Sequence, residues 1–296
     1  MPPRRLRPRR PPRRSRRPRS RLPRPAEDPT ATRRRLDAEL VRRGLVASRE
    51  RAREAIERGE VVVAGAPAAK PSRLVAPDEA IVVAGPRARF VGRGGEKLAG
   101  ALDRFGVDLT GRRVLDAGAS TGGFTDCALQ AGAAEVVAVD VGRGQLHQRL
   151  RTDERVVVRE RTNVRHLVPG DLGAPFEAVV ADLSFISLRT VAPALVALAA
   201  PGAELIWLVK PQFEAGRAEV ARGRGIVTDA EVWERVLVEV LGALTGLGAA
   251  IMGIMASPLR GADGNVEFLV HARLGATASS VPVEAAIAAA VAEARG

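Results

Sequence analysis

Four short apolar segments of the chain each end in a charged residue, namely Asp116, Asp140, Asp182 and Lys210. Runs of this length that are rich in Val, Leu and Ile are typical of strands buried inside a parallel sheet. The carboxyl ends of such strands meet at one edge of the sheet, where ligands bind. Carboxylates at that edge can hold the hydroxyls of a cofactor, and an amine beside them can remove the proton of a substrate hydroxyl. A single strand-end Asp or Lys is more often a helix cap or a solvated strand tip, so the interpretation depends on their order.

Lysine is scarce in this chain, because only Lys70, Lys97 and Lys210 occur among the 46 Lys and Arg residues. A lysine amine can lose its proton and act as a base, whereas a guanidinium cannot. Lys210 ends an apolar segment and is therefore the candidate base. Lys70 stands just before Pro71 and is expected on the surface.

A glycine-rich loop follows the first of these segments, with the sequence DAGASTGG over residues 116–123. The dinucleotide fingerprint G-x-G-x-x-G is absent, and Phe124 follows the glycines where a phosphate-binding loop ends in Gly-Lys-Ser or Gly-Lys-Thr. Asp116 followed by small residues instead resembles motif I of methyltransferases that use S-adenosyl-L-methionine, in which the backbone approaches the cofactor closely. That resemblance implies that Asp140 accepts hydrogen bonds from the cofactor's ribose. The residues expected to bind this cofactor are Asp116, Gly118, Ser120, Thr121, Gly122, Gly123, Phe124, Asp140, Asn163 and Asp182.

The methyltransferase resemblance also places residues from the two ends of this region. A methyltransferase-like sheet has a last strand, over residues 266–272, that runs antiparallel beside the strand ending at Lys210. Glu267 would then lie at the same edge as Asp182 and Lys210, and Lys97, on an expected helix over residues 94–105, would join them. A Lys-Asp-Lys-Glu tetrad of this kind resembles the catalytic residues of ribose 2′-O-methyltransferases of the FtsJ type. The tetrad expected to be catalytic is Lys97, Asp182, Lys210 and Glu267.

A small module is expected ahead of this region. Residues 35–41 and 49–58 have the apolar spacing of two short helices, with Ser48 as the cap of the second, and short strands follow over residues 60–65 and 80–83. The motif over residues 35–65 resembles the S4 RNA-binding fold. Six acidic residues stand among the nine Arg of residues 31–60, so charge alone fits a solvated helical surface equally well. The candidate RNA-binding residues are Arg33, Arg34, Arg35, Arg42, Arg43, Arg49 and Arg53.

The net charge of +12 arises mainly from residues 1–30, which hold twelve Arg and two acidic residues. Eight Pro in the first 25 residues predict a tail without fixed structure. The tail is interpreted either as an arm that attracts phosphates or as a translation of sequence upstream of the true start. A single cysteine, Cys127, excludes a disulfide framework and a cysteine-based metal site within one chain. Neither a metal nor a membrane-spanning segment is expected, which fits a cytoplasmic protein.

The two regions together resemble the TlyA-type haemolysin and ribosomal RNA methyltransferase family. The resemblance implies an α/β fold with a Rossmann-like sheet of seven strands, preceded by a small α+β RNA-binding domain. It also implies transfer of a methyl group to the 2′-hydroxyl of cytidine in ribosomal RNA or ribosomal subunits. Two alternatives stay open, an RNA-binding assembly factor with weak or no catalysis and a membrane-active haemolysin. The expected domains are a tail (1–30), an S4-like domain (31–84), a linker (85–92), a methyltransferase domain (93–275) and an Ala-rich helix (276–296).

Overall fold

The computed structural model describes residues 33–46, 48–83, 89–261 and 264–296. The chain divides into two compact units, one ending at Arg87 and one beginning at Ala88. We call them the N-terminal unit and the C-terminal unit and treat each by itself. The expected tail over residues 1–30 lies outside the described residues, as does the first half of the expected linker, residues 85–88.

The N-terminal unit is a helix pair packed on short strands. Helix α1 (Leu36–Arg42) ends before Gly44. Helix α2 (Arg49–Glu57) is capped by Ser48, whose side chain accepts a hydrogen bond from the backbone N–H of Arg51 at 3.2 Å. Leu36, Leu40 and Ile56 point inward and are almost fully buried. The strands are β1 (Arg34–Arg35), β2 (Val61–Val63), β3 (Ala66–Pro67), β4 (Leu74–Val75) and β5 (Ile81–Val83). Strand β2 pairs with both β3 and β5, so the helix and strand order predicted for this module is present.

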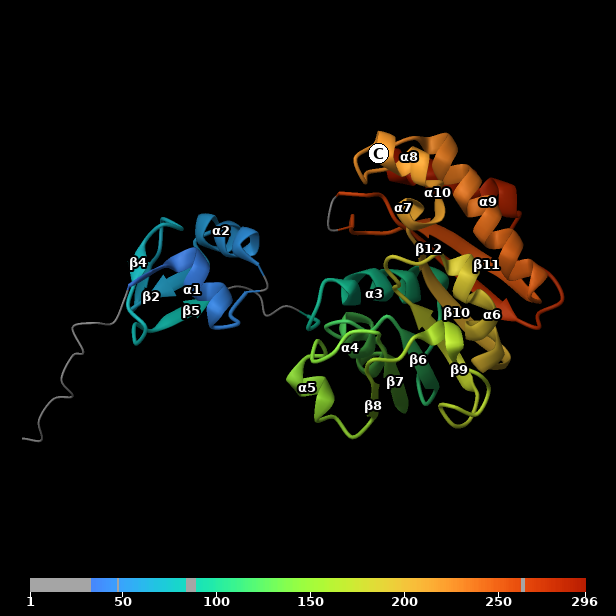
Figure 1. Cartoon of the computed structure of the whole chain (residues 1–296), viewed down its shortest axis with the longest axis horizontal. Helices are drawn as coiled ribbons and strands as arrows, with labels where there is room; N and C mark the ends of the chain where they lie inside the picture. The colour runs from blue at the N-terminus through green and yellow to red at the C-terminus, as the bar shows by residue number, and fades with distance from the viewer. Residues whose placement is uncertain (1–32, 47, 84–88, 262–263) are drawn as a thin grey trace, which may run out of the picture. The chain divides into compact units, whose positions relative to one another are not determined.

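The C-terminal unit contains one sheet of seven strands, in the order β11-β12-β10-β9-β6-β7-β8 (Figure 1). The strands are β6 (Arg113–Ala117), β7 (Glu135–Val139), β8 (Val156–Arg159), β9 (Phe176–Ala181), β10 (Ala199–Val209), β11 (Ala249–Ala256) and β12 (Phe268–Leu274). Strands β6 to β10 are parallel, and β12 runs antiparallel to both of its neighbours, β10 and β11. The predicted fold class is therefore confirmed.

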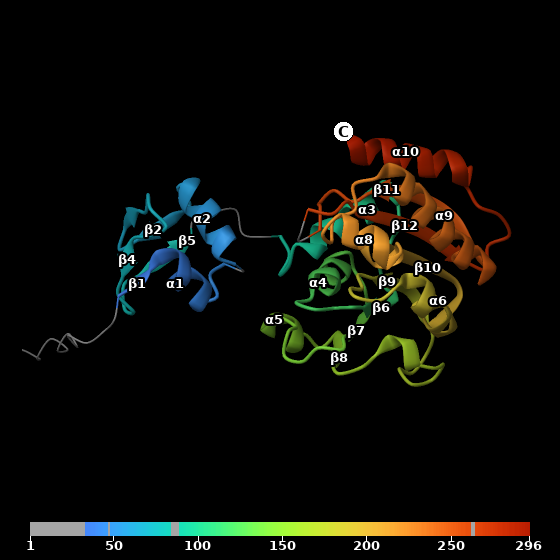
Figure 2. The same ribbon diagram turned by 45° about the horizontal axis from the view of Figure 1, so that its top comes forward.

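Helices cover both faces of this sheet, and each face has its own hydrophobic core. Helices α3 (Gly94–Phe105) and α4 (Gly123–Gln130) pack together on one face, where Leu98 and Phe124 are buried. Helices α6 (Leu188–Leu198), α9 (Ala230–Gly246) and α10 (Val283–Arg295) cover the other face. Figures 1 and 2 show α9 and α10 beside β11. The shorter helices are α5 (Gln148–Arg151), η1 (Val164–His166), α7 (Pro211–Glu214) and α8 (Arg217–Arg222).

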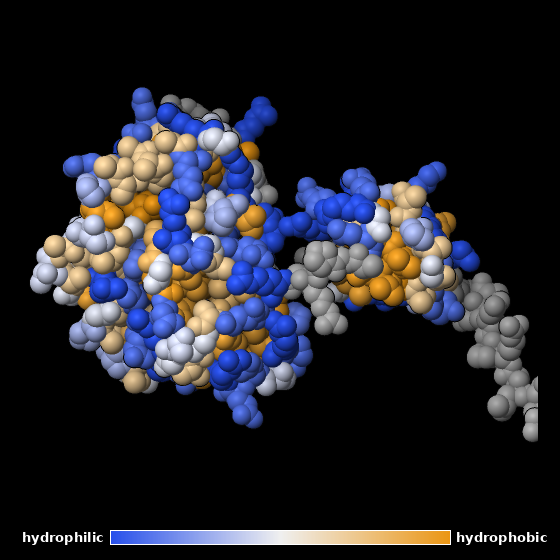
Figure 3. All heavy atoms as spheres, turned by 180° about the vertical axis from the view of Figure 1, so that it is seen from behind, coloured by the Kyte–Doolittle hydropathy of each residue, from blue (hydrophilic) through white to orange (hydrophobic). Residues whose placement is uncertain are grey.

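Two elements near the carboxyl end add to the sequence prediction. Strand β11 completes the sheet over residues that the sequence left unassigned. The Ala-rich helix begins only at Val283, because Ser279 and Ser280 hydrogen-bond to β11 and Pro282 precedes the first turn. Hydrophilic residues are spread over the face of each unit that Figure 3 shows. Within the described part of the chain, no helix is long and apolar enough to cross a bilayer.

Candidate active site

The strand register brings three of the four expected catalytic residues to one edge of the sheet. Val209, at the end of β10, pairs with Phe268, at the start of β12. Lys210 directly follows Val209, and Glu267 directly precedes Phe268, so the two residues lie on neighbouring strands at this edge. Asp182 follows the last residue of β9, on the other side of β10. The antiparallel last strand predicted from the resemblance is what places Glu267 here.

The four side chains form two ion pairs. The ammonium of Lys97, on α3, pairs with Glu267, and both residues are almost fully buried. The Lys210 ammonium lies 2.7 Å from Oδ1 of Asp182, and it also donates to the hydroxyl of Ser184 at 2.9 Å. A Cβ atom added to Gly94, the first residue of α3, would lie 3.5 Å from Asp182 Oδ2, so α3 begins against the second pair. Two lysines and two carboxylates therefore share the edge, as the tetrad requires.

A pocket of about 510 Å³ opens beside Asp182. Its walls come from the loops that follow β6, β7, β8 and β9. Of the expected cofactor-binding residues, Gly118, Ser120, Asp140, Asn163 and Asp182 line it. The remaining lining residues are Val139, Val141, Gln145, Thr162, Val164, Leu183, Ser184, Phe185 and Ile186. Asp182 is thus the residue that both lines the pocket and pairs with Lys210.

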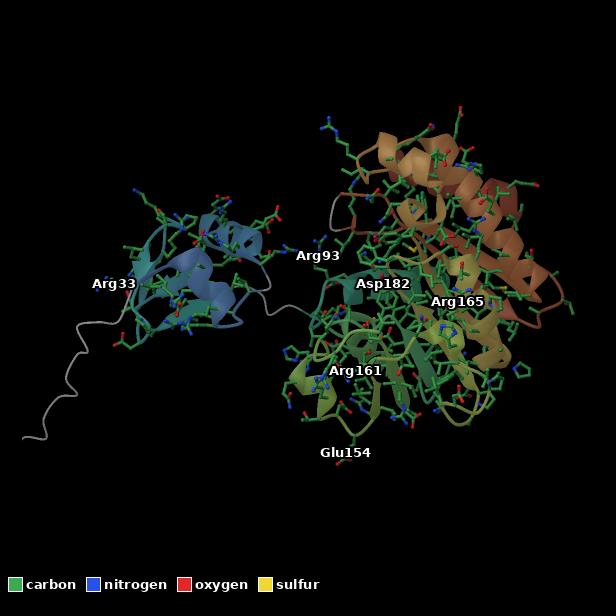
Figure 4. All side chains as sticks on the ribbon, viewed as in Figure 1. Arg33, Arg93, Glu154, Arg161, Arg165 and Asp182 are labelled. Carbon is green, nitrogen blue, oxygen red and sulfur yellow. The ribbon has the colours of Figure 1, made fainter. Side chains whose placement is uncertain are left out.

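Three exposed arginines stand next to pocket-lining residues in the chain. Arg161 and Arg165, labelled in Figure 4 with Asp182, flank the lining residues 162–164 and have no ion pair among the described residues. Arg143 follows lining residue Val141 by two positions and is unpaired in the same sense. Because acidic partners do not neutralise these side chains, they are available to contact anions.

Asp140 is held in place by the loops around it. One carboxylate oxygen accepts the backbone N–H of Ser120 at 2.8 Å, and the other accepts that of Gly142 at 2.7 Å. A carboxylate has about four acceptor sites, so Asp140 can still accept hydroxyl donors from a ligand in the pocket. Asn163 caps η1 by accepting the N–H of Arg165 at 3.0 Å.

Asp116 lies beneath the pocket and is fully buried. Its Oδ2 accepts the hydroxyl of Thr125 at 2.6 Å, while its Oδ1 has no hydrogen-bond partner among the described residues. Burial, with a smaller contribution from the nearby charges of Asp182 and Asp140, raises the pKa of this carboxyl to about 7, against the hydrogen bond from Thr125. Because three carboxyl groups lie together, this region favours a ligand that carries positive charge.

Neighbouring segments of the protein lie so close to the glycines of the loop that no side chain would fit there. A Cβ at Gly118 would lie 2.5 Å from the carbonyl oxygen of Asp182, and one at Gly122 would lie 2.2 Å from Leu150. At Gly123 it would lie 2.8 Å from the backbone nitrogen of Gly95, at the start of α3. These glycines therefore allow β6, α4 and α5 to pack closely. Gly122 and Gly123 are not among the residues that line the pocket, and their close approach to the cofactor stays a prediction.

Two further expected cofactor residues also lie away from the pocket lining. Phe124 is only 3 % exposed and packs in the core against the start of α3. It is the second residue of α4, and its aromatic ring belongs to the hydrophobic core that α3 and α4 share. Thr121 is exposed but does not line the pocket. For Phe124, the structure shows a packing role in the core, and its expected contact with the cofactor stays a prediction.

Phe185 is a feature that the sequence did not single out. It is 92 % exposed, lines the pocket, and has a φ of +65°, which is unusual for a bulky residue. Its ring packs against that of Phe213, with the centroids 5.3 Å apart. An exposed aromatic face beside Lys210 offers a stacking surface for a nucleobase. Strained, exposed side chains of this kind gather at functional sites, but no local sequence pattern reveals a backbone angle.

The arginines of the N-terminal unit are arranged around two buried acids. Arg35, Arg49 and Arg53 converge on Asp37, with nitrogen to oxygen distances of 3.0, 3.2 and 3.9 Å. The hydrogen bond from Arg35 is the main cause that lowers the pKa of Asp37 to about 2. These three guanidinium groups remain about half exposed, so one buried carboxylate holds together a cationic surface.

A second acid, Glu39, organises the remaining arginines of α1. It pairs with Arg42 at 2.6 Å and with Arg43 at 2.7 Å, and the hydrogen bond from Arg42 contributes most to lowering its pKa to about 2. Arg43 also donates to the backbone carbonyls of residues 76, 77 and 79 and is only 20 % exposed. Arg43 therefore ties the end of α1 to the loop between β4 and β5, while Arg33 and Arg34 are exposed.

Other candidate chemistry is absent from the described residues. No group of His, Cys, Asp and Glu among them could hold a metal ion. His271 instead pairs with the buried Glu204 at 2.7 Å. Cys127 is 3 % exposed, and burial raises the pKa of its thiol to about 12, so it packs as a small apolar residue.

Comparison with protein families gives two matches. The model of FtsJ-like methyltransferases matches residues 90–274, and the model of the S4 domain matches residues 34–81. The first match covers the sheet, the pocket and all four residues of the two ion pairs. The second covers the helix pair of the N-terminal unit and most of its strands.

Individual relatives agree with these matches. The 16S/23S rRNA (cytidine-2′-O)-methyltransferase TlyA of Mycobacterium tuberculosis is 51 % identical over 244 residues, covering 82 % of this chain and 91 % of the relative. Hemolysin A of Brachyspira hyodysenteriae is 37 % identical over 80 % of this chain and 98 % of its own length. A solved structure from Streptococcus thermophilus that carries a provisional hemolysin name is 37 % identical, with a TM-score of 0.71 over 90 % of this chain and 98 % of that one.

Proposed function

Since the chain belongs to the FtsJ-like methyltransferase family and carries an S4 domain, we propose that it methylates the ribose 2′-hydroxyl of a cytidine in ribosomal RNA. The observation that carries this proposal is the position of Asp182, which lines the pocket and pairs with Lys210. A cofactor in the pocket and a substrate hydroxyl at Lys210 would then meet at one carboxylate. The M. tuberculosis relative, named for this reaction, supports the choice of nucleotide and RNA.

The pocket fits S-adenosylmethionine as the cofactor. This molecule carries a positive sulfonium, and the buried Asp116, the partly free Asp140 and Asp182 supply negative charge around the pocket. Asp140 would accept the ribose hydroxyls of the cofactor, and Asn163 would lie beside its adenine. S-adenosylmethionine supplies a methyl group that an oxygen can attack once that oxygen loses its proton.

The two ion pairs have different roles at the substrate hydroxyl, since one supplies the base and the other orients the oxygen. Lys210, in its uncharged form, accepts the proton of the ribose oxygen. Asp182 and Ser184 hold the Lys210 nitrogen at 2.7 and 2.9 Å, so that it faces the pocket. Lys97, fixed by Glu267, orients the ribose oxygen from the other side. Phe185, which is exposed at the edge of the pocket, would stack on the base of the target nucleotide.

The N-terminal unit would supply RNA affinity. Guanidinium groups contact phosphates, and those around Asp37 are held at fixed positions while half exposed. We further propose that the protein works in the cytoplasm on ribosomal subunits or their RNA.

Catalysis is favoured over the two alternatives left open by the sequence. Taking charged groups out of water costs free energy, even when they are paired. An assembly factor without activity would gain nothing that offsets this cost from the two lysine–carboxylate pairs beside the pocket. Lysis is supported by the hemolysin names of two similar proteins. The membrane-inserting helix that lysis would use has no counterpart among the described residues.

The test uses the three lysines of the chain. Lys210→Ala and Lys97→Ala should each lower methyl transfer to unmodified ribosomal subunits by about 100-fold or more, while cofactor affinity changes by about twofold or less. Lys70→Ala is the matched control, because Lys70 is an exposed residue of the N-terminal unit. Nuclease digestion and mass spectrometry of the product locate the methyl group. Full activity of both variants, or a methyl group on the base, would refute the proposal.

A further inference from the structure

The loop after β9 and the turn after β10 are joined residue by residue. Lys210 contacts Asp182 and Ser184, and Phe213 packs against Phe185. Glu214 makes the last set of contacts, with the first residues of α6. The order of contacts runs in parallel along the two segments, so the loop of residues 182–187 has one fixed alignment on the turn of residues 210–214.

Glu214 is the most heavily bonded member of this alignment. One carboxylate oxygen accepts the hydroxyl of Ser187 at 2.6 Å and the Nε of Arg189 at 3.3 Å, and the other accepts the backbone N–H of Leu188 at 2.5 Å. The Arg189 guanidinium also donates to the backbone carbonyl of Glu214 at 3.0 Å. The side chain is 2 % exposed, so solvent does not compete for these bonds.

These bonds act at a helix start. Ser187 is the N-cap of α6, and the Leu188 N–H is one of the helix donors without an intrahelical acceptor. A carboxylate from another segment satisfies that donor and interacts favourably with the positive end of the helix. The start of α6, and with it the end of the 182–187 loop, is therefore fixed to the residue that lies four positions after Lys210.

The loop needs such an anchor, because Phe185 has a positive φ that a bulky residue avoids. Strained backbone persists only where surrounding contacts hold it. We propose that Glu214 is a positioning residue for methyl transfer, which fixes the 182–187 loop on the 210–214 turn and so sets the geometry of Asp182 and Lys210. This inference rests on the proposed function, since Glu214 itself does not line the pocket.

Glu214→Gln keeps the shape of the side chain but replaces one acceptor oxygen with a donor, which faces the donors of the α6 start. A matched control is Glu204→Gln. Glu204 is also buried and accepts from Arg273 at 2.8 Å while pairing with His271 at 2.7 Å. It lies in the middle of β10, where the pairing with β12 begins, and it does not line the pocket, so both variants lose buried bonds but only one touches the loop.

Two readouts in the full-length protein separate positioning from stability. Amide hydrogen exchange of residues 182–189 should accelerate in Glu214→Gln and stay at the wild-type rate in Glu204→Gln. At saturating cofactor and RNA, and well below the melting temperature, the single-turnover transfer rate of Glu214→Gln should fall by about tenfold or more. Glu204→Gln should transfer at the wild-type rate despite its lower stability. Ser187→Ala, which removes one of three donors, should show a smaller loss.

Two outcomes would overturn the inference, namely unchanged exchange in Glu214→Gln or an unchanged transfer rate despite faster exchange. A wild-type protein that methylates no ribosomal RNA refutes the proposed function instead. In that case the affinity for the cofactor tests whether Glu214 positions the 182–187 loop, because residues 182–186 line the pocket. Weaker cofactor binding in Glu214→Gln alone would uphold its positioning role, and equal binding in both variants would overturn it.

Discussion

Asp116 has the most unusual environment of any residue in the site, a fully buried carboxyl with one unpartnered oxygen. Burial raises its pKa from 3.8 to about 7. Between these values the folded protein keeps a proton on Asp116 that the unfolded chain has lost. The contribution of Asp116 to stability therefore decreases as the pH rises from about 4 to about 7.

A cationic cofactor should stabilise the charged form of the Asp116 carboxyl. Binding of the cofactor should therefore release the proton from Asp116. We predict that affinity for S-adenosylmethionine rises severalfold between about pH 6 and pH 8. Asp116→Asn should flatten this dependence, which calorimetric titration at several pH values would reveal. If the variant keeps the wild-type slope, Asp116 is not the group that titrates.

The sequence predicted where the charged residues of the site lie better than it predicted which side chains they contact. Asp182, Lys210 and Glu267 were predictable, because each stands at the end or start of an apolar segment whose direction in the sheet follows from the fold. The partners of Glu214 and the neighbours of Gly122 were not predictable. Those contacts join segments that are distant in the chain, and no local period records them.

Among the elements, the approach of β6 to β9 depends on Gly118. This residue has a φ of +89°, and a Cβ there would lie 2.5 Å from a backbone oxygen that cannot rotate away. We predict that Gly118→Ala lowers the free energy of unfolding of the C-terminal unit by roughly 2–4 kcal/mol, from strain and overlap together. Urea unfolding followed by tryptophan fluorescence reports on this unit, because both Trp lie within it.

Gly111→Ala separates the effect of backbone strain from that of steric overlap. Gly111 has a similar φ of +73°, but no atom lies within 4 Å of an added Cβ. Its substitution should cost about 1 kcal/mol from backbone strain alone. Equal losses at the two positions would show that the close approach at Gly118 is unimportant.

The elements themselves were predicted unevenly. Helix α3 spans residues 94–105, the range over which a helix was expected. Strand β11, with the sequence AAIMGIMA, is apolar on both faces, so periodicity does not distinguish it from a buried helix. The start of α10 depends on hydrogen bonds to β11, which are contacts made only after the sheet has formed.

At the scale of the whole molecule, RNA affinity and methyl transfer are assigned to separate units. We predict that the double variant Arg49→Gln, Arg53→Gln weakens RNA binding and lowers its log–log salt slope by roughly 1–2, since each lost phosphate contact removes about 0.7–0.9. Cofactor affinity should not change. Arg155→Gln, which removes an exposed arginine before β8 on the C-terminal unit, is the control and should leave the slope as it is. An unaltered slope in the double variant would remove these arginines from the RNA surface.

The pair between Lys97 and Glu267 joins residues 170 positions apart, one before the first strand of the sheet and one before its last. Contacts with such long separations form late, because closing a long loop must precede them. During synthesis the chain must be nearly complete before Glu267 emerges and β12 can insert between β10 and β11. Activity is therefore a late event of folding, and a nascent or truncated chain without β12 could bind RNA through its N-terminal unit but could not modify it.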